Sequence, residues 1–322
     1  MRVMMRTAIA IVLVGCGASR SPAPPPAFDP KPVVIAGRFD GDRAPDGNSV
    51  VLDAPRGLIV VDTGRHRAHQ DKLLAHAKAV GKPIIAIVNT HWHLDHSGGN
   101  AEIKAVYPGA EIVTSNAIDR AYVEFFAKNR RKSLEYLASG KATPQQVEDI
   151  KLDHAAVDDP QHGLRPTRPV TASAMIELGG RTLDVRVAPY AATEADVWLY
   201  EDATKTVIAG DLVVAPVPFF DTACAAGWLA ALDAIAATPF VTLVPGHGEP
   251  MTRAAFMTWK TAFERFVDCA ASDQAPAACA AGWRRDAGPP ADPQIDEYAA
   301  YYVEDVLRSA SAQERFCQPP AR

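Results

Sequence analysis

Three histidines and one aspartate fall within six residues of this sequence, in the stretch His91-Trp92-His93-Leu94-Asp95-His96. Imidazole nitrogen and carboxylate oxygen are both ligands of zinc. His91 and His93 are two residues apart, so an extended backbone directs both side chains the same way. Asp95 and His96 are adjacent, so both can bind metal only if the chain turns there, and that turn lets one loop serve two neighbouring ions. Since the whole chain has 9 histidines, this cluster indicates a metal site.

The segments around the cluster suit that role. The apolar residues 83–88 predict a short buried strand before it, and Ser97-Gly98-Gly99-Asn100 predicts a tight turn into a helix after it. A strand that ends in a glycine-rich loop holds side chains at fixed positions. Further strands are predicted at 33–36, 49–52, 58–61 and 111–114, and helices at 69–80 and 100–107. This alternation predicts an α/β fold built in layers.

The pattern His91-x-His93-x-Asp95-His96 resembles the metal-binding signature of the metallo-β-lactamase superfamily of zinc hydrolases. Three more segments are similar to motifs of that family and follow in its order: residues 57–64 with Asp62, residues 209–212 with Asp211, and residues 244–248 with His247. The resemblance covers roughly residues 33–260. It implies an αββα four-layer sandwich, which here would carry a C-terminal helical extension.

The resemblance also implies the roles of these residues. In the two-metal form of the family, His91 and His93 hold one ion together with a third histidine. The other ion is held by Asp95, His96 and His247, with Asp211 bridging the two. Asp62 would lie behind the ligands and orient an imidazole, and Asp95 would also carry a proton during turnover. Zinc lowers the pKa of a bound water towards about 7, which supplies hydroxide at neutral pH.

One ligand of the first metal is missing from this sequence. If Thr193 and Asp196 fix the register, the third histidine of the family falls at Ala192, and alanine cannot bind metal. The second ligand set is complete, so we expect one or two zinc ions, with weaker binding in the first set. Four residues could replace the missing imidazole, and the sequence does not choose among them: Tyr190, Glu194, His154 and His162.

Residues 1–15 predict a signal peptide, with Arg2 and Arg6 before a short apolar run. The sequence Leu13-Val14-Gly15-Cys16 resembles a bacterial lipobox, so Cys16 is the predicted lipidation site and the protein a cell-envelope lipoprotein, exported to the periplasmic side. A plain secretory signal is the alternative. The mature chain is expected to have a Pro-rich tether over 16–32, a metallo-β-lactamase-like domain over 33–260 with a helical insertion at 116–159, and a helical extension over 261–322.

Four cysteines remain once Cys16 is set aside, an even number that suits an oxidising compartment. Three pairings are possible. We favour Cys269 with Cys279, which encloses a short Ala- and Ser-rich loop, and therefore Cys224 with Cys317, which would fasten the C-terminal tail to the domain.

Other conspicuous side chains are expected to be structural. We predict that His66, His69 and His76 lie on the surface of a helix whose apolar face contains Leu73 and Ala77. The aromatic residues of the insertion are predicted to be core residues more than substrate contacts: Tyr122, Phe125 and Phe126. The run Arg130-Arg131-Lys132 is expected on a solvated face.

The sequence favours a zinc-dependent hydrolase that acts on a small ester, lactone or amide in the cell envelope. Hydrolysis of β-lactams is a specific alternative, and a glutathione thioester is disfavoured because that substrate is mainly cytosolic. An accessory metal-binding lipoprotein with a degenerate site is the alternative from another class. The net charge of −5 gives no support to nucleic-acid binding. We expect contact with the membrane through the lipid anchor only, and the oligomeric state stays open.

Overall fold

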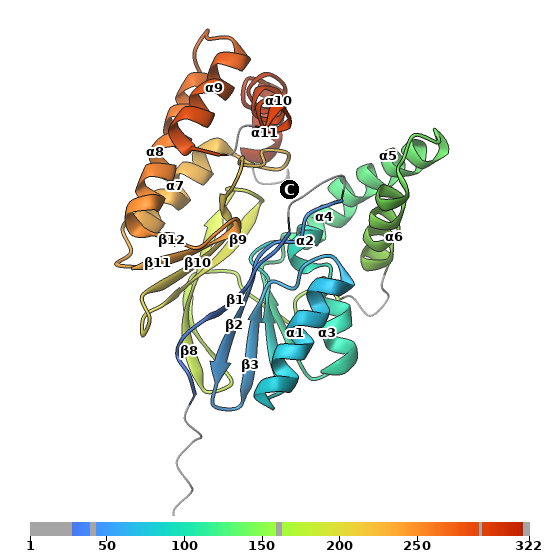
Figure 1. Ribbon diagram of the computed structural model, residues 1–322, viewed down its shortest axis with the longest axis vertical. Coiled ribbons are helices and arrows are strands. Elements are labelled where there is room, and N and C mark those ends of the chain that lie inside the picture. The colour runs from blue at the N-terminus through green and yellow to red at the C-terminus, as the bar shows by residue number, and fades with distance from the viewer. Residues whose placement is uncertain (1–27, 39–42, 159–162, 290–291, 318–322) are drawn as a thin grey trace, which may run out of the picture.

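The computed structural model describes residues 28–38, 43–158, 163–289 and 292–317 (Figure 1). The predicted signal peptide, Cys16, most of the tether and His162 lie outside these residues. No helix in the part of the chain that the structure describes is long and apolar enough to cross a membrane.

The first sheet has six strands in the order β1-β2-β3-β4-β5-β6. Strands β2 to β5 pack at its centre, with β3 parallel to β4 and β4 parallel to β5. The strands are β1 (Val33–Ile35), β2 (Ser49–Ala54), β3 (Gly57–Val61), β4 (Ile84–Val88), β5 (Glu111–Thr114) and β6 (Arg168–Pro169). Side chains alternate along β2, so Val50 and Leu52 face the second sheet whereas Val51 faces helix α1 (Arg67–Val80).

The second sheet also has six strands, in the order β12-β11-β10-β9-β8-β7. Its members are β7 (Ala174–Leu178), β8 (Arg181–Pro189), β9 (Ala195–Glu201), β10 (Thr206–Val214), β11 (Thr242–His247) and β12 (Met251–Thr252). Strands β10 and β11 run parallel, so their carboxyl ends meet at one edge of the sheet. That edge carries Asp211 and His247.

Helices cover the outer face of each sheet. Helix α1 packs on the first sheet with α3 (Asn100–Val106), through Leu73 and Ile103. Helices α7 (Ala225–Ala236) and α8 (Arg253–Ala270) pack on the second sheet through Trp228 and Phe263. Apolar side chains of both sheets fill the space between them. This arrangement confirms the αββα sandwich expected from the sequence, and burial of these faces is the main force that stabilises it.

The insertion is helical, as the sequence predicts. It consists of α4 (Ile118–Ala121), the π-helix η1 (Tyr122–Phe126), α5 (Ala127–Ala138) and α6 (Pro144–Asp158). The C-terminal part adds α9 (Pro276–Ala287), α10 (Pro293–Tyr301), the π-helix η2 (Tyr302–Leu307) and α11 (Ala310–Cys317). Figure 1 shows these two groups of helices on either side of the sandwich edge that carries the short helix α2 (Leu94–Ser97). The expected boundary between residues 260 and 261 falls inside α8.

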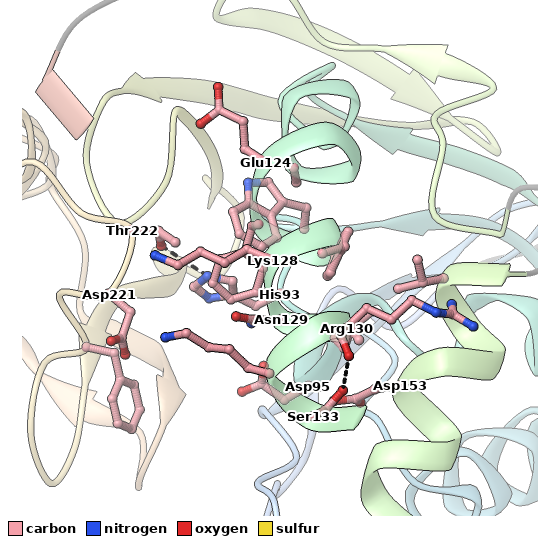
Figure 2. Close-up of a pocket in the computed structure, with 18 of the residues that line it drawn as sticks. His93, Asp95, Glu124, Lys128, Asn129, Arg130, Ser133, Asp153, Asp221 and Thr222 are labelled. Carbon is pink, nitrogen blue, oxygen red and sulfur yellow. Dashed lines mark hydrogen bonds between the residues drawn. The ribbon is translucent and has the colours of Figure 1, made fainter. Parts of the chain in front are cut away.

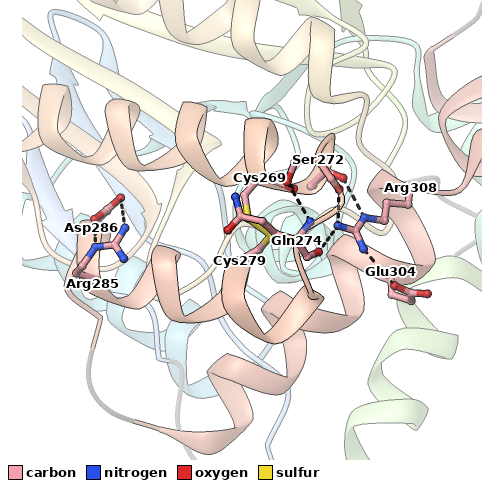
Figure 3. The surroundings of a disulfide bond; sticks show 9 residues. Cys269, Ser272, Gln274, Cys279, Arg285, Asp286, Glu304 and Arg308 are labelled. Carbon is pink, nitrogen blue, oxygen red and sulfur yellow. Dashed lines mark hydrogen bonds and ion pairs between the residues drawn. A yellow bond between two sulfur atoms is a disulfide. The ribbon is translucent and has the colours of Figure 1, made fainter.

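Both predicted disulfide bonds are present. Cys269–Cys279 joins the end of α8 to α9 (Figure 3), and Cys224–Cys317 joins the start of α7 to α11. Beside the first disulfide, the guanidinium of Arg308 donates hydrogen bonds to the backbone carbonyls of Ala270, Ser272 and Gln274. The C-terminal helices are therefore fastened to the sandwich covalently and by polar contacts.

Two histidines are not on the surface, contrary to the sequence prediction. His66 is 7% exposed and His69 3% exposed, and only His76 is half-buried. The ring nitrogens of His66 contact Asp46 at 3.1 Å and Asp149 at 3.0 Å, and His69 Nε2 lies 2.7 Å from Ser49 Oγ. The apolar stripe of α1 continues back from Leu73 to residue 69, so His69 belongs to the inner face of the helix.

Candidate metal centre

Four side chains from three separate segments converge at the sandwich edge. Asp95 and His96 come from helix α2, Asp211 from β10 and His247 from the end of β11. One ligand atom from each lies within 4.8 Å of the others. His96 Nε2 is 3.2 Å from His247 Nε2, which in turn is 3.0 Å from an oxygen of Asp95. The structure thus brings together the set that the sequence predicts to be complete.

The carboxylate of Asp62 lies directly behind this group. Its Oδ2 is 2.8 Å from His96 Nδ1, and it also accepts hydrogen bonds from the backbone N–H and the hydroxyl of Thr90. Asp62 follows β3, and its φ of 59° turns the chain sharply there. An Nδ1–H that donates to this carboxylate leaves the Nε2 lone pair of His96 free to face the other ligands.

His91 and His93 form a second group with Asp211, again within 4.8 Å. His91 Nε2 is 3.0 Å from His93 Nδ1 and 3.7 Å from Asp211 Oδ2. The other oxygen of Asp211 faces His96 and His247, at 3.0 Å and 3.6 Å. Asp211 therefore lies between the two groups, which is the position of a bridging ligand.

A threonine lies where the first group has its gap. Ala192 is 2% exposed and packs in the core around the second sheet, so it contributes no polar atom. Thr222 donates from Oγ1 to the backbone carbonyl of Ala192 at 2.8 Å, and the same oxygen is 3.1 Å from His93 Nε2. The sequence analysis did not identify Thr222, and no motif around it could have done so, because only folding brings the segment after β10 back to His93.

Two of the side chains considered as substitutes have other partners. Glu194 accepts a hydrogen bond from the indole N–H of Trp92 at 3.0 Å, and His154 Nε2 is 2.9 Å from the hydroxyl of Ser133. Tyr190 occupies a turn with φ of 49°. Among the residues that the structure describes, none of the three joins either converging group.

Two glycines allow the ligands to come this close. A Cβ atom on Gly246 would lie 2.0 Å from Asp211 Oδ1, and one on Gly47 would lie 2.4 Å from the ring of His96. Both are impossible van der Waals contacts, so the neighbouring ligand would have to move. Gly246 lies in the motif of residues 244–248, whereas Gly47 lies outside every motif and was missed.

The electrostatics of the site favour a cation. Asp211 Oδ1 is buried and has no hydrogen-bond partner among the described residues, although His96 Nε2 is 3.0 Å away. Burial alone would lower the pKa of His96, yet the charges of Asp211, Asp95 and Asp62 raise the pKa of that imidazole well above its usual range. A field that holds a proton so strongly also stabilises a divalent ion at the same point. The donor set of nitrogen and oxygen atoms fits zinc.

A cavity of about 1030 Å³ opens over the two groups, and His93, Asp95 and Asp211 line it (Figure 2). Its walls come from the insertion and from the C-terminal helices. Phe125 is half-buried against Trp92, with ring centroids 4.8 Å apart, whereas Phe126 is buried in the core. Tyr122, Phe125 and Phe126 all pack in or against one small core, as predicted, and Phe125 and Phe126 also line the cavity.

Arg65 connects the insertion to the metal-ligand group. Its guanidinium is 3.9 Å from Asp95 Oδ1 and forms an ion pair with Asp153 of α6. We expect Arg65→Ala to lower the free energy of unfolding by about 2 kcal/mol, because the buried carboxylate of Asp95 and the half-buried one of Asp153 lose a shared cation. Arg67→Ala, which removes an exposed arginine two residues further along the chain, is the matched control and should change little. Equal effects of the two variants in urea denaturation would contradict a linking role for Arg65.

Asp196 gives the folded chain a distinct pH dependence. Burial raises the pKa of its carboxyl to about 7, although hydrogen bonds from Thr193 lower it. The folded state thus keeps a proton that the unfolded chain releases near pH 3.8. The contribution of Asp196 to the free energy of unfolding is therefore complete below pH 3.8 and is lost as the pH rises through about 7. As the pH rises from 5 to 8, the metal-free unsubstituted protein should lose about 3 kcal/mol of unfolding free energy through this group. Asp196→Asn should not show that loss. A pH-independent difference would refute this assignment.

Comparison with known proteins agrees with this geometry. The family model described as the metallo-beta-lactamase superfamily matches residues 43–247. A linear primary-alkylsulfatase from Pseudomonas sp. is 24% identical over 223 residues, which are 63% of this chain and 41% of that protein. An atrochrysone carboxyl ACP thioesterase from Aspergillus fumigatus is 33% identical over 93 residues, 28% of this chain and 29% of that protein. The chain thus spans less than half the length of either relative.

Two solved structures show the same fold. A metallo-beta-lactamase family protein from Thermus thermophilus has a TM-score of 0.56 at 18% identity and aligns with 80% of this chain and 86% of its own. A stereoselective inverting sec-alkylsulfatase from Pseudomonas sp. has a TM-score of 0.57 at 17% identity, over 85% of this chain and 50% of its own.

Proposed function

Since the chain belongs to the metallo-beta-lactamase superfamily, we propose that it is a zinc-dependent hydrolase of small ester, lactone or amide substrates. The observation that carries this proposal is the convergence of Asp95, His96, Asp211 and His247 under an open cavity. The curated relatives include an alkylsulfatase and a thioesterase, so alkyl sulfates and thioesters belong among the substrates to be tried.

The residues present fit one complete zinc site and one partial site. His91 and His93 would hold the first ion, Asp95, His96 and His247 the second, and Asp211 would bridge them. A bound zinc ion supplies a water of lowered pKa and polarises the substrate oxygen. Asp62 fixes the orientation of His96, while Thr222 and Thr90 contact ring nitrogens of His93 and His91.

We assign Asp95 the role of proton carrier. Its carboxylate lines the cavity between Arg65 and His247. Burial by itself would raise its pKa, but His96, His247 and Arg65 lower the pKa of Asp95 well below the usual range. The group is therefore ionised at neutral pH, as a carboxylate that accepts a proton has to be.

The cell envelope is the proposed location, on the strength of the predicted signal peptide and Cys16. The two disulfides suit an oxidising compartment. Hydrolysis of β-lactams is a weaker candidate because Ala192 leaves the first site without its third imidazole. An accessory role in metal binding is the competing proposal of another class, and the same gap supports it.

The test is a panel of chromogenic esters, lactones, alkyl sulfates and cephalosporins, assayed with added zinc. We expect zinc-dependent turnover of at least one class, and its loss in His93→Ala. The matched control is His154→Ala, because His154 lines the same cavity but contacts Ser133 instead of the ligand groups. Silence across the panel combined with tight zinc binding would favour the accessory role, and absence of any zinc affinity would reject both proposals.

A further inference from the structure

The pocket-facing side of the insertion carries two lysines above the ligand groups. Lys128 and Lys132 lie one turn apart on α5, and both line the cavity. Figure 2 shows Lys128 extending from its helix toward the side on which His93 and Thr222 lie. Four residues of α-helix correspond to a rise of about 6 Å, so two ammonium groups flank one stretch of the cavity wall.

These lysines differ from the other cations of the cavity. Arg65 is paired with Asp153, Arg130 with Asp158, and Arg315 with Glu124. Within the described ranges of the chain, neither Lys128 nor Lys132 has an ion pair or a hydrogen bond. Like charges one helical turn apart repel each other, so an anion between them is favourable.

The same helical run is apolar nearer the ligand groups. The ring of Phe125 in η1 is tilted against two neighbouring rings, with its centroid 5.9 Å from that of His93 and 4.8 Å from that of Trp92. A π-helical segment is rare and often marks a functional site, and here it lies where the insertion meets the ligand histidine. Moving out along the insertion, the wall thus changes from aromatic to cationic.

Acidic residues lie on the other wall. Asp221 accepts a hydrogen bond from the hydroxyl of Tyr302 at 2.9 Å, and Asp305 lines the cavity from η2. Figure 2 shows Asp221 across the cavity from the helix of Lys128. The carboxylates on this wall would repel an anionic group, so such a group is expected on the side of the lysines.

We propose that the cavity selects substrates that carry a second, anionic group away from the hydrolysed bond. Lys128 and Lys132 bind that group, a carboxylate, sulfate or phosphate, and an apolar segment next to the hydrolysed bond packs on Phe125 and Trp92. This inference rests on the proposed hydrolase function of the same site. It further specifies that the substrate is amphiphilic and negatively charged.

The experiment compares mono-p-nitrophenyl glutarate, which is anionic, with the neutral p-nitrophenyl pentanoate. We expect K128A/K132A to lower the ratio of kcat/KM for the anionic ester to that for the neutral ester by about tenfold. The matched control is R131A/K151A, which removes the same charge from two exposed side chains of the insertion that do not line the cavity. It should keep the ratio within about twofold. Salt at about 1 M should reduce the ratio only where both lysines are present.

Calorimetric binding of 6-phenylhexanoate and 6-phenylhexanol to the same zinc-loaded proteins gives a second readout that needs no turnover. A preference for the carboxylate that disappears in K128A/K132A supports the inference even if neither ester is hydrolysed, in which case the proposed function is the part that fails. An equal loss of affinity for both ligands in K128A/K132A, or an unchanged preference for the carboxylate, would overturn the inference. Either result would leave the proposed hydrolase function intact.

Discussion

Replacing His96 with alanine is expected to reduce hydrolysis at least about 10³-fold and to remove one equivalent of bound zinc. His96 is fully buried and its Nε2 faces Asp211, Asp95 and His247. Without His96 the complete site keeps three ligands, so the metal is held less firmly and activates its water less well. A loss of several kcal/mol in transition-state stabilisation gives an effect of this size, because each 1.4 kcal/mol or so changes the rate tenfold. Steady-state kinetics and metal analysis of the purified variant measure both effects.

The control for this variant is His76→Ala, a half-buried histidine on α1 that has no place in either ligand group. Circular dichroism establishes that both variants are folded. If His96→Ala retained zinc and activity at the level of His76→Ala, the assignment of the complete site would be wrong.

Asp62→Asn should weaken zinc binding by about 10- to 100-fold although no proposed ligand is changed. An asparagine tolerates the positive φ of this position and can still accept from the N–H of Thr90. Its amide N–H₂ would then face His96 Nδ1, so the imidazole must give up that proton and carry it on Nε2, where a metal ligand needs a lone pair.

Competition with a chromogenic chelator measures this loss. Asp53→Asn is the matched control, because Asp53 lies on a neighbouring strand and pairs with Lys82, away from the ligand groups. An Asp62→Asn variant with unchanged zinc affinity would show that Asp62 has only a structural role in the turn.

The sequence predicted which of these side chains converge, because most of that information is local. His91 to His96 are close together in the sequence, and Asp211 lies within a strand and His247 at the end of one, both with an apolar pattern that is easily recognised. The layered fold follows from the same alternation of strands and helices. The disulfides were also predicted, since a short Ala- and Ser-rich loop favoured one pairing and left the other by elimination.

The errors and omissions come from packing between distant segments. His69 lies four residues before Leu73, on the inner stripe of α1, so its burial was available from periodicity but was overridden by its polarity. Thr222 and the ion pair of Arg65 with Asp153 had no sequence signal, because each joins segments that only the folded insertion and the β10–α7 connection bring together.

Anomalous diffraction at the zinc absorption edge, from crystals of the zinc-loaded protein, tests the central claim most directly. The account predicts a strong peak bounded by Asp95, His96, Asp211 and His247, at about 2.0–2.2 Å from the ligand nitrogen and oxygen atoms. A weaker peak is expected beside His91 and His93. Zinc bound only elsewhere on the molecule, with these side chains metal-free at saturating concentration, would contradict it.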